Sequence, residues 1–346
     1  MSYALIFIYV LLVLYVVFFS GYRYEKKLII IPTFFLSLFV GMRGAVSGYD
    51  YLVYKYFYEL DYKENPYGYE MLFVACRNIV KFLGGDYNVF IFLLGVFFVC
   101  GTCYIFNRYS NNPSLVFLIY LSTFFFWHNF NILRNFIAII LFYMALKFIL
   151  EKRIIHYYLL VIIAVNFHKT ALILLPLYFI GTVKLKKNMM VFLTLLALIL
   201  IPVSDLVFQL KTNFLGISER ISRYSGIREM GNTQEYLEII VVLIFATAIF
   251  VWEKNRGGEI SDEENLFYNL TFYSFLIFTI FFRFAVILRV MEYFRFAYII
   301  LFVSVLGRVE KKNIKYIALM ALMIYMIARY YNSVYDYGIA NYTTWL

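Results

Sequence analysis

The sequence predicts an all-α polytopic membrane protein of about 12 transmembrane helices, some of them short or broken. Composition carries this prediction, because 64% of the 346 residues are hydrophobic and only 15% are charged, with a mean hydropathy of +0.78. Continuous apolar runs such as VFLTLLALILI are typical of membrane helices, whereas barrel strands alternate apolar and polar residues in segments of about ten. The whole chain, 1–346, is therefore predicted to form a single integral membrane domain.

Short basic linkers separate every second pair of apolar segments, among them YRYEKK, EKRIIH and KLKK. Short basic loops remain in the cytoplasm, so both termini are predicted outside. The net charge of +10 suits inner loops that face anionic lipid, and its dispersal between apolar runs argues against nucleic acid as a partner. The apolar segments are 3–20, 28–42, 87–106, 114–127, 135–150, 157–167, 170–183, 188–203, 236–252, 266–282, 296–307 and 313–330.

Two longer outer loops are predicted, at 43–86 and 204–235. Within the first, the segment 69–83 has helical spacing, with Glu70 and Arg77 on one face and apolar residues beside them. We expect this segment to be an amphipathic helix at the membrane interface. If it crossed the membrane instead, every later helix would be inverted. The second loop is expected to form an outer cap.

The stretch RGAVSGYDYLVY (43–54) is the first candidate site. Its two glycines permit tight turns beside a ligand. Asp50 could act as a general base or accept a hydrogen bond from a sugar hydroxyl, with Tyr51 and Tyr54 beside it. The alternative is a surface turn in which Arg43 pairs with Asp50 and the tyrosines join an interfacial aromatic belt.

A second candidate is HNFNILRN (128–135), which lies between two apolar segments. His128, Asn131 and Asn135 have helical spacing and form one polar stripe, and Arg134 begins the next span. Hydrogen bonds between helices are an equally good explanation for the asparagines. Snorkelling explains Arg134 less well, because other charges usually flank a snorkelling arginine at a helix end.

The stretch NFHKTAL places His168 and Lys169 between two short apolar segments. A histidine can act as a base near neutral pH, so His168 is a candidate catalytic residue. The alternative is a histidine satisfied within the core. No Asp, Glu or His cluster surrounds it at ligand spacing, so neither a metal nor another cofactor is expected.

The last candidate is RFAVILRVMEYFR (283–295), where three arginines accompany one glutamate. An ion-pair ladder is possible, since Glu292 lies three residues from both Arg289 and Arg295. The excess positive charge favours an anion, and arginine suits phosphate through its planar fork. A shared anionic ligand such as a lipid-linked pyrophosphate would explain the predicted outer-face cations Arg43, Arg134, Lys169, Arg289 and Arg295.

In series these stretches resemble the EpsG-like branch of the bacterial Wzy-type polysaccharide polymerases. The resemblance covers roughly residues 40–295, and only YGYEMLF departs from the family's Glu-Pro-Gly-like pattern. It implies a metal-independent glycosyltransferase, similar in fold to the C-type enzymes, in the bacterial cytoplasmic membrane with its active site facing the periplasm or exterior. The stretches that carry the resemblance are RGAVSGYDYLVY, NILRNFIAI, FHKTAL, RISRY and RVMEYF.

Such polymerases move a growing glycan from undecaprenyl pyrophosphate to the terminal sugar of a second lipid-linked repeat unit. The resemblance therefore implies donor and acceptor lipid-linked oligosaccharides, membrane lipid, and a possible flippase and chain-length regulator as partners. The five outer-face cations would bind the pyrophosphate, and His168 or Asp50 would deprotonate the acceptor. The residues expected to contact sugars are Tyr51, Tyr54, Asn131, Tyr293, Glu70, Arg220 and Tyr224.

Three other functions remain open at this point. A flippase or exporter of lipid-linked oligosaccharide would also need buried cations, but it would favour related halves and charges near mid-span. An O-antigen ligase or membrane acyltransferase would share the arginine and histidine chemistry and differ in its acceptor. A non-catalytic assembly partner would not need so many polar residues beside apolar segments.

Overall fold

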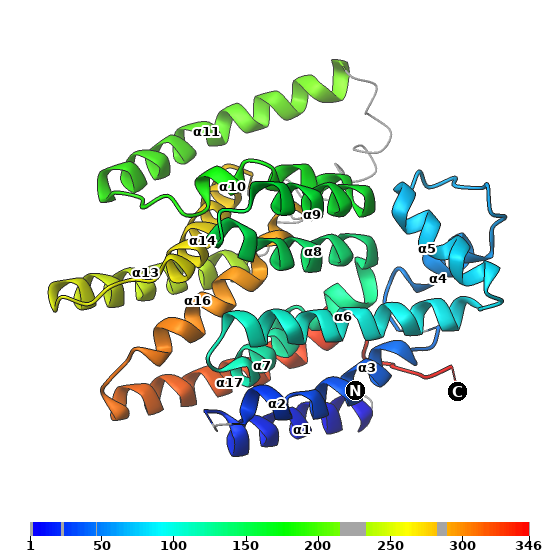
Figure 1. Cartoon of the computed structure of the whole chain (residues 1–346), viewed down its shortest axis with the longest axis horizontal. Helices are drawn as coiled ribbons and strands as arrows, with labels where there is room; N and C mark the ends of the chain where they lie inside the picture. The colour runs from blue at the N-terminus through cyan, green and yellow to red at the C-terminus, as the bar shows by residue number, and fades with distance from the viewer. Residues whose placement is uncertain (1–2, 22–23, 46, 215–232, 282–288, 346) are drawn as a thin grey trace. The chain divides into compact units, whose positions relative to one another are not determined.

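The computed structural model describes residues 3–21, 24–45, 47–214, 233–281 and 289–345, with the backbone alone over 204–214 (Figure 1). Within these residues the regular structure is helical, and extended pairing is limited to one isolated bridge. The prediction of an all-α fold is thereby confirmed. Contacts divide the chain into unit 1, made of Met1–Phe148, Ile155–Leu172 and Val309–Leu346, and unit 2, made of Ile149–Ile154 and Ile173–Arg308.

Unit 1 holds the first nine α-helices and the last one. A π-helix, η1, interrupts the chain between α7 and α8, and the 3₁₀ helix η2 leads from unit 1 into unit 2. These elements are α1 (Tyr3–Phe19), α2 (Glu25–Leu28), α3 (Ile30–Gly41), α4 (Tyr51–Glu59), α5 (Met71–Phe82), α6 (Tyr87–Tyr109), α7 (Pro113–Thr123), η1 (Trp127–Asn131), α8 (Leu133–Leu150), α9 (Ile154–Phe167), η2 (Lys169–Leu174) and α17 (Lys312–Asp336).

The core of unit 1 forms around α6 and α7. α7 is buried along its whole length and contacts α1, α6 and α17. α3 crosses α6 at two glycines: a Cβ on Gly95 would lie 2.8 Å from the backbone nitrogen of Gly41. The missing side chains let the two backbones approach closely, as small residues do in membrane helix pairs.

Unit 2 is a helical bundle in which α14 contacts α11, α13 and α16. Asn269 of α14 is buried and donates to the carbonyl oxygens of Gly181 (2.8 Å) and Val183 (2.7 Å), which ties the exit of α10 to the bundle. The elements of unit 2 are α10 (Leu177–Ile180), α11 (Lys187–Phe214), α13 (Thr233–Asn255), α14 (Asp262–Phe281), η3 (Glu292–Phe294) and α16 (Arg295–Gly307).

Several helices suit a membrane, so the chain is a multi-pass membrane protein. Five helices in the described residues are long and apolar enough to cross one, and five more are apolar but shorter. The count of about 12 spans stays a prediction. The five long helices are Tyr87–Tyr109, Leu133–Leu150, Thr233–Asn255, Arg289–Gly307 and Lys312–Asp336.

Two stretches differ from the sequence prediction. The predicted span 170–183 is divided into η2 and α10 around Pro176, which lacks the N–H that would donate within a continuous helix. The predicted outer loop 204–235 begins as helix, because α11 continues through Pro202 to Phe214, and α13 starts at Thr233. The part between these helices lies outside the described residues.

The outer loop 43–86 folds around Arg77. This side chain is fully buried and donates to the carbonyl oxygens of Phe57, Asp61, Tyr62 and Glu64, at 2.9–3.2 Å. Arg77 therefore holds the end of α4 and the loop that follows it against α5. α5 matches the predicted amphipathic helix 69–83 apart from its ends.

The opposite face of α5 exposes apolar side chains. Met71, Ile79 and Phe82 are 70%, 57% and 83% exposed, and their spacing puts them on one side of the helix. An apolar face turned away from the protein is what an interfacial helix presents to lipid. The placement of α5 at the membrane interface stays a prediction.

Candidate functional site

Glu70 lies at the centre of a charged cluster in unit 1. It precedes the first turn of α5 in an extended conformation. Its Oε2 forms an ion pair with Nη1 of Arg134, and its Oε1 lies 3.6 Å from Nδ1 of His168. The backbone N–H of Lys169 donates to the same Oε1 at 3.2 Å. The side chains of Glu70, Arg134 and His168 are largely buried, with 8–16% of each exposed.

The helical hairpin α8–α9 explains why Arg134 and His168 meet. Arg134 lies in the first turn of α8, and His168 follows the last turn of α9, where its N–H donates to the carbonyl of Ala164 at 2.8 Å. A short turn, 151–153, joins the two helices, so they run antiparallel (Figure 1). The start of α8 and the end of α9 therefore lie at the same end of the hairpin, where Glu70 reaches both.

The partners of Glu70 keep its carboxylate ionised. Burial alone would raise the pKa of Glu70, but the His168 hydrogen bond, the Arg134 charge and backbone N–H groups lower it from 4.5 to about 2. The guanidinium of Arg134 also lies over the ring of Tyr69, 4.0 Å from its centroid. At neutral pH the cluster thus holds a carboxylate against a guanidinium and an imidazole.

Asp50 and Tyr54 lie near this cluster. Burial and the nearby groups Tyr54 and Asp50 raise the pKa of Tyr69, while the charge of Arg134 opposes that rise. The rings of Tyr54 and Tyr69 are 6.0 Å apart. Asp50 immediately precedes α4 and is half-buried. The charge of Asp50 therefore acts on Tyr69, the ring beneath Arg134, while His168 faces Glu70, the ion-pair partner of the same arginine.

The stabilisation supplied by Glu70 should depend on pH. Because the folded-state pKa is lowered, this stabilisation is present above the ordinary value of 4.5 and is lost as pH falls through about 2. We expect Glu70→Gln to lower the melting temperature of detergent-purified protein at pH 7, for a loss of ~1–3 kcal/mol in the free energy of unfolding. The difference should shrink below about pH 4. A difference that stayed unchanged as pH fell to about 2 would contradict the assigned ionisation.

Arg43, Gly44 and Gly48 contact distant parts of the same chain. Arg43 donates from Nη1 to the carbonyl of Asn129 and lies 4.9 Å from the ring centroid of Phe130. Gly44 donates from its N–H to the carbonyl of Thr343 at 2.7 Å. Gly48 has φ +95°, and a Cβ there would lie 3.1 Å from the carbonyl oxygen of Phe130. The close approach that these glycines permit is thus made by the chain.

Residues 338–345 form the unexpected partner of this stretch. Arg43 pairs with Thr344 in the isolated bridge, and the indole N–H of Trp345 donates to the carbonyl of Gly41 at 3.1 Å. Asn131 joins the same contacts, since its Oδ1 accepts from the N–H of Tyr49 at 2.7 Å. Asn131 thus holds the turn before α4, and its predicted contact with sugar stays a prediction.

Other predicted polar and aromatic residues lie within packed surroundings. Tyr51 is buried, with its ring 5.2 Å from that of Tyr87, whose hydroxyl donates to the carbonyl of Tyr51 at 3.1 Å. His128 is buried in η1, where Nδ1 lies 3.2 Å from the hydroxyl of Tyr120 and the ring stacks on Phe136. His128 therefore has the contacts of a core histidine.

In unit 2, Arg295 contacts two buried carboxylates. Its Nε and Nη2 donate to the two oxygens of Glu235, each at 2.8 Å, and its Nη1 donates to Glu292. Glu235 is completely buried, and Glu292 and Arg295 are nearly so. The sequence reasoning missed Glu235. The excess of arginine over glutamate in RFAVILRVMEYFR is therefore balanced at Arg295 by a carboxylate from α13.

Four further predicted site residues lie in unit 2 or outside the described residues. Arg289 and Tyr293 belong to unit 2, where Tyr293 is buried. Arg220 and Tyr224 lie outside the described residues. Pyrophosphate binding by any of these cations stays a prediction. Among the described residues no group of three or more His, Cys, Asp or Glu is placed to hold a metal ion.

The helices and the Glu70 cluster define a multi-pass membrane protein that carries a buried carboxylate, guanidinium and imidazole at one end of a helical hairpin. The model of the EpsG family matches residues 26–344, and the chain belongs to this family. The family is associated with glycosyltransferase-like polymerase activity in polysaccharide biosynthesis. No curated protein and no solved structure matches the chain.

Proposed function

We propose that this protein polymerises oligosaccharide repeat units linked to undecaprenyl pyrophosphate, by glycosyl transfer at the outer face of the bacterial cytoplasmic membrane. The observation that supports this most is the cluster of Glu70, Arg134 and His168 in a membrane protein of the EpsG family. A polymerase needs a base for the acceptor and positive charge for the departing pyrophosphate. The cluster supplies candidates for both.

His168 is proposed to deprotonate the acceptor hydroxyl. Protonated at Nδ1, the nitrogen that faces Glu70, His168 is proposed to take up the hydroxyl proton at Nε2, and the carboxylate stabilises the imidazolium that results. The 3.6 Å separation is longer than a good hydrogen bond, and such catalytic contacts often tighten when substrate binds. Glu70, which the sequence predicts to contact sugar, is proposed here to position His168. Asp50 is kept as the alternative base.

Arg134 is proposed to bind the leaving pyrophosphate. The acceptor oxygen bonds to the anomeric carbon while the bond from that carbon to the pyrophosphate oxygen breaks, so negative charge grows on the leaving group. Nε of Arg134 has no hydrogen-bond acceptor among the described residues, although it is buried. A pyrophosphate oxygen would satisfy it by a charge-assisted hydrogen bond. The exposed side chain of Lys169 begins beside the same carboxylate and could add a second cation.

Reconstitution with a purified lipid-linked repeat unit tests this function. We expect the wild-type protein to yield a ladder of products, and Arg134→Ala and Arg289→Ala each to abolish long-chain polymer while the protein remains in the membrane. Arg134→Lys keeps the charge but loses the planar fork, so it should recover only part of the chain length. Arg153→Ala is the matched control, because Arg153 is exposed and pairs with Glu151.

Each other outcome has a definite meaning. Near-normal chain length in both alanine variants would contradict the pyrophosphate role. A single transfer without a ladder would favour a ligase, and transport without new glycosidic bonds would favour a flippase.

A further inference from the structure

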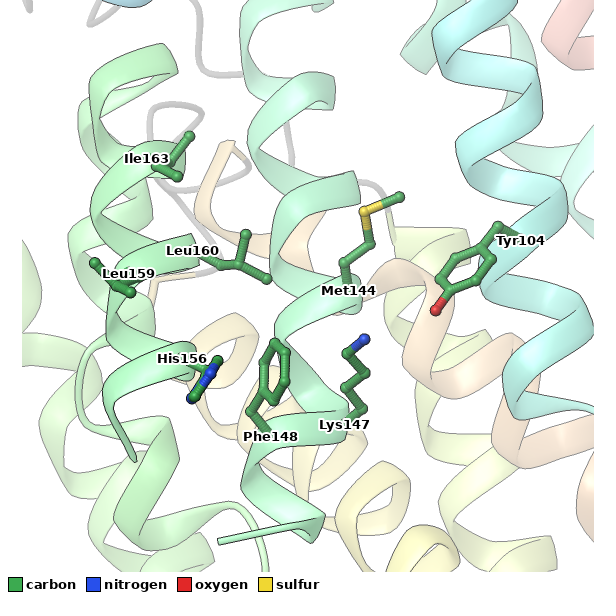
Figure 2. A pocket seen from close by; sticks show the side chains of 8 residues that line it. All are labelled: Tyr104, Met144, Lys147, Phe148, His156, Leu159, Leu160 and Ile163. Carbon is green, nitrogen blue, oxygen red and sulfur yellow. The ribbon is translucent and has the colours of Figure 1, made fainter. Parts of the chain in front are cut away.

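A cavity lies at the end of the α8–α9 hairpin that is away from the Glu70 cluster. It has a volume of about 450 Å³ and opens between α6, α8 and α9 (Figure 2). Lys147 of α8 is separated from Arg134 by roughly 20 Å of helix, at 1.5 Å per residue. The cavity is therefore distinct from the Glu70 cluster. Its lining residues are Tyr104, Met144, Lys147, Phe148, His156, Leu159, Leu160 and Ile163.

Lys147 is the unusual feature of this cavity. A lysine near the end of a membrane helix normally extends its ammonium toward the interface. Figure 2 shows Lys147 pointing back along α8 toward Met144, into the gap that Tyr104 also faces. Its Nζ lies 4.7 Å from the ring centroid of Phe148. Within the part of the chain that the structure describes, no carboxylate forms an ion pair with it.

The rest of the cavity lining consists of an apolar wall, which includes Leu159 and Ile163, and a polar group, His156. Leu159 and Ile163 are 55% and 39% exposed, so this wall of α9 continues onto the outer surface of unit 1. The ring of His156 is tilted against that of Phe148, with ring centroids 5.1 Å apart, and adds a polar group at the same end as Lys147. An occupant that suits these walls has a compact anionic group joined to a hydrocarbon chain.

We propose that this cavity binds an anionic phospholipid of the surrounding membrane. The phosphate would contact the Lys147 ammonium, within reach of Tyr104 and His156, and the first part of an acyl chain would lie along Leu159 and Ile163. The adjoining linker EKRIIH is basic and is predicted to be cytoplasmic. Basic pockets between membrane helices at that face bind anionic headgroups, because the cytoplasmic leaflet is rich in them.

Free inorganic phosphate suits the cavity less well, because it would leave the apolar wall uncovered. A snorkelling lysine explains neither the direction of the side chain nor the open space in front of it. The proposal is independent of the polymerase reaction, since none of the cavity residues belongs to the Glu70 cluster.

Native mass spectrometry of the full chain, titrated with phosphatidylglycerol or phosphatidylcholine, tests the proposal. We expect phosphatidylglycerol to bind more tightly, and Lys147→Gln to weaken its binding about fivefold, since a lysine near anionic lipid is worth about 1 kcal/mol. Leu160→Trp should also weaken binding, because it fills the cavity without changing charge. Lys147→Arg should retain binding.

Lys152→Gln is the matched control, because Lys152 is exposed in the turn at the same end of the hairpin. It removes one positive charge without altering the cavity, so binding should change by less than about twofold. If Lys152→Gln weakened phosphatidylglycerol binding as much as Lys147→Gln does, general charge attraction would explain both effects, and the proposal would be overturned. Unchanged binding in both Lys147→Gln and Leu160→Trp would also overturn it, as would displacement of phosphatidylglycerol by inorganic phosphate or preferential binding of a polyprenyl phosphate.

Discussion

Glu70→Gln is expected to lower the rate of repeat-unit polymerisation about 100-fold or more, which is the lower end of what a positioned base contributes. Glutamine keeps the size of the side chain and an oxygen for the N–H of Lys169, but it loses the charge that pairs with Arg134 and faces His168. The imidazolium formed in the reaction would then lack its counter-charge. The measurement is the initial rate of polymer formation by reconstituted protein.

A double-mutant cycle shows whether Glu70 acts through His168. If it does, Glu70→Gln should cost little more in a His168→Asn background, because residues that act as a unit are not additive. Glu59→Gln is the control, since Glu59 is exposed and pairs with Lys55 on the surface of α4. Fully additive losses would show that the two residues act separately. A larger loss from Asp50→Asn than from His168→Asn would assign the base to Asp50.

Much of the helix pattern could be predicted from apolar segments alone. α6, α8, α9 and α13 begin and end within a few residues of the predicted segments, because long apolar runs between charged linkers have few other solutions in a membrane. α11 was harder, since its last turns are polar and Pro202 lies inside it. A proline is tolerated in a membrane helix, so its presence does not mark an end.

The sequence predicted single residues of the candidate site but not the contacts between them. Arg134 and His168 could be singled out because each carries charge or a proton beside apolar sequence, where such groups need partners. Their shared partner could not be found by spacing, because Glu70 is far from both in sequence. Its only local signal was an acidic residue immediately before an amphipathic helix.

Gly44 and Gly48, which follow Arg43, show a second limit of prediction from sequence. Their conformational freedom permits close approach, but a sequence does not say what approaches. Thr343 lies against Gly44, and Thr344 pairs with Arg43. Local sequence could not have revealed this, because the pairing joins two distant parts of the chain.

Arg295→Met is expected to destabilise the protein by about 3–5 kcal/mol, or a fall of roughly 10 °C in melting temperature, because it leaves two buried carboxylates without their cation. Glu235 and Glu292 both bind the Arg295 guanidinium and are almost inaccessible to solvent. Arg153→Met removes an exposed arginine that pairs with Glu151, and it should have little effect.

The rescue variant separates a structural role from substrate binding. Every nitrogen of the Arg295 side chain already donates to a carboxylate, so a pyrophosphate would have to displace one of them. Combining Arg295→Met with Glu235→Gln and Glu292→Gln removes all three charges, and we expect most of the lost stability to return, since replacing a whole buried ion group costs far less than breaking it. If Arg295→Met alone melts like the wild type yet makes no polymer, Arg295 acts on the substrate and the carboxylates only hold it in place.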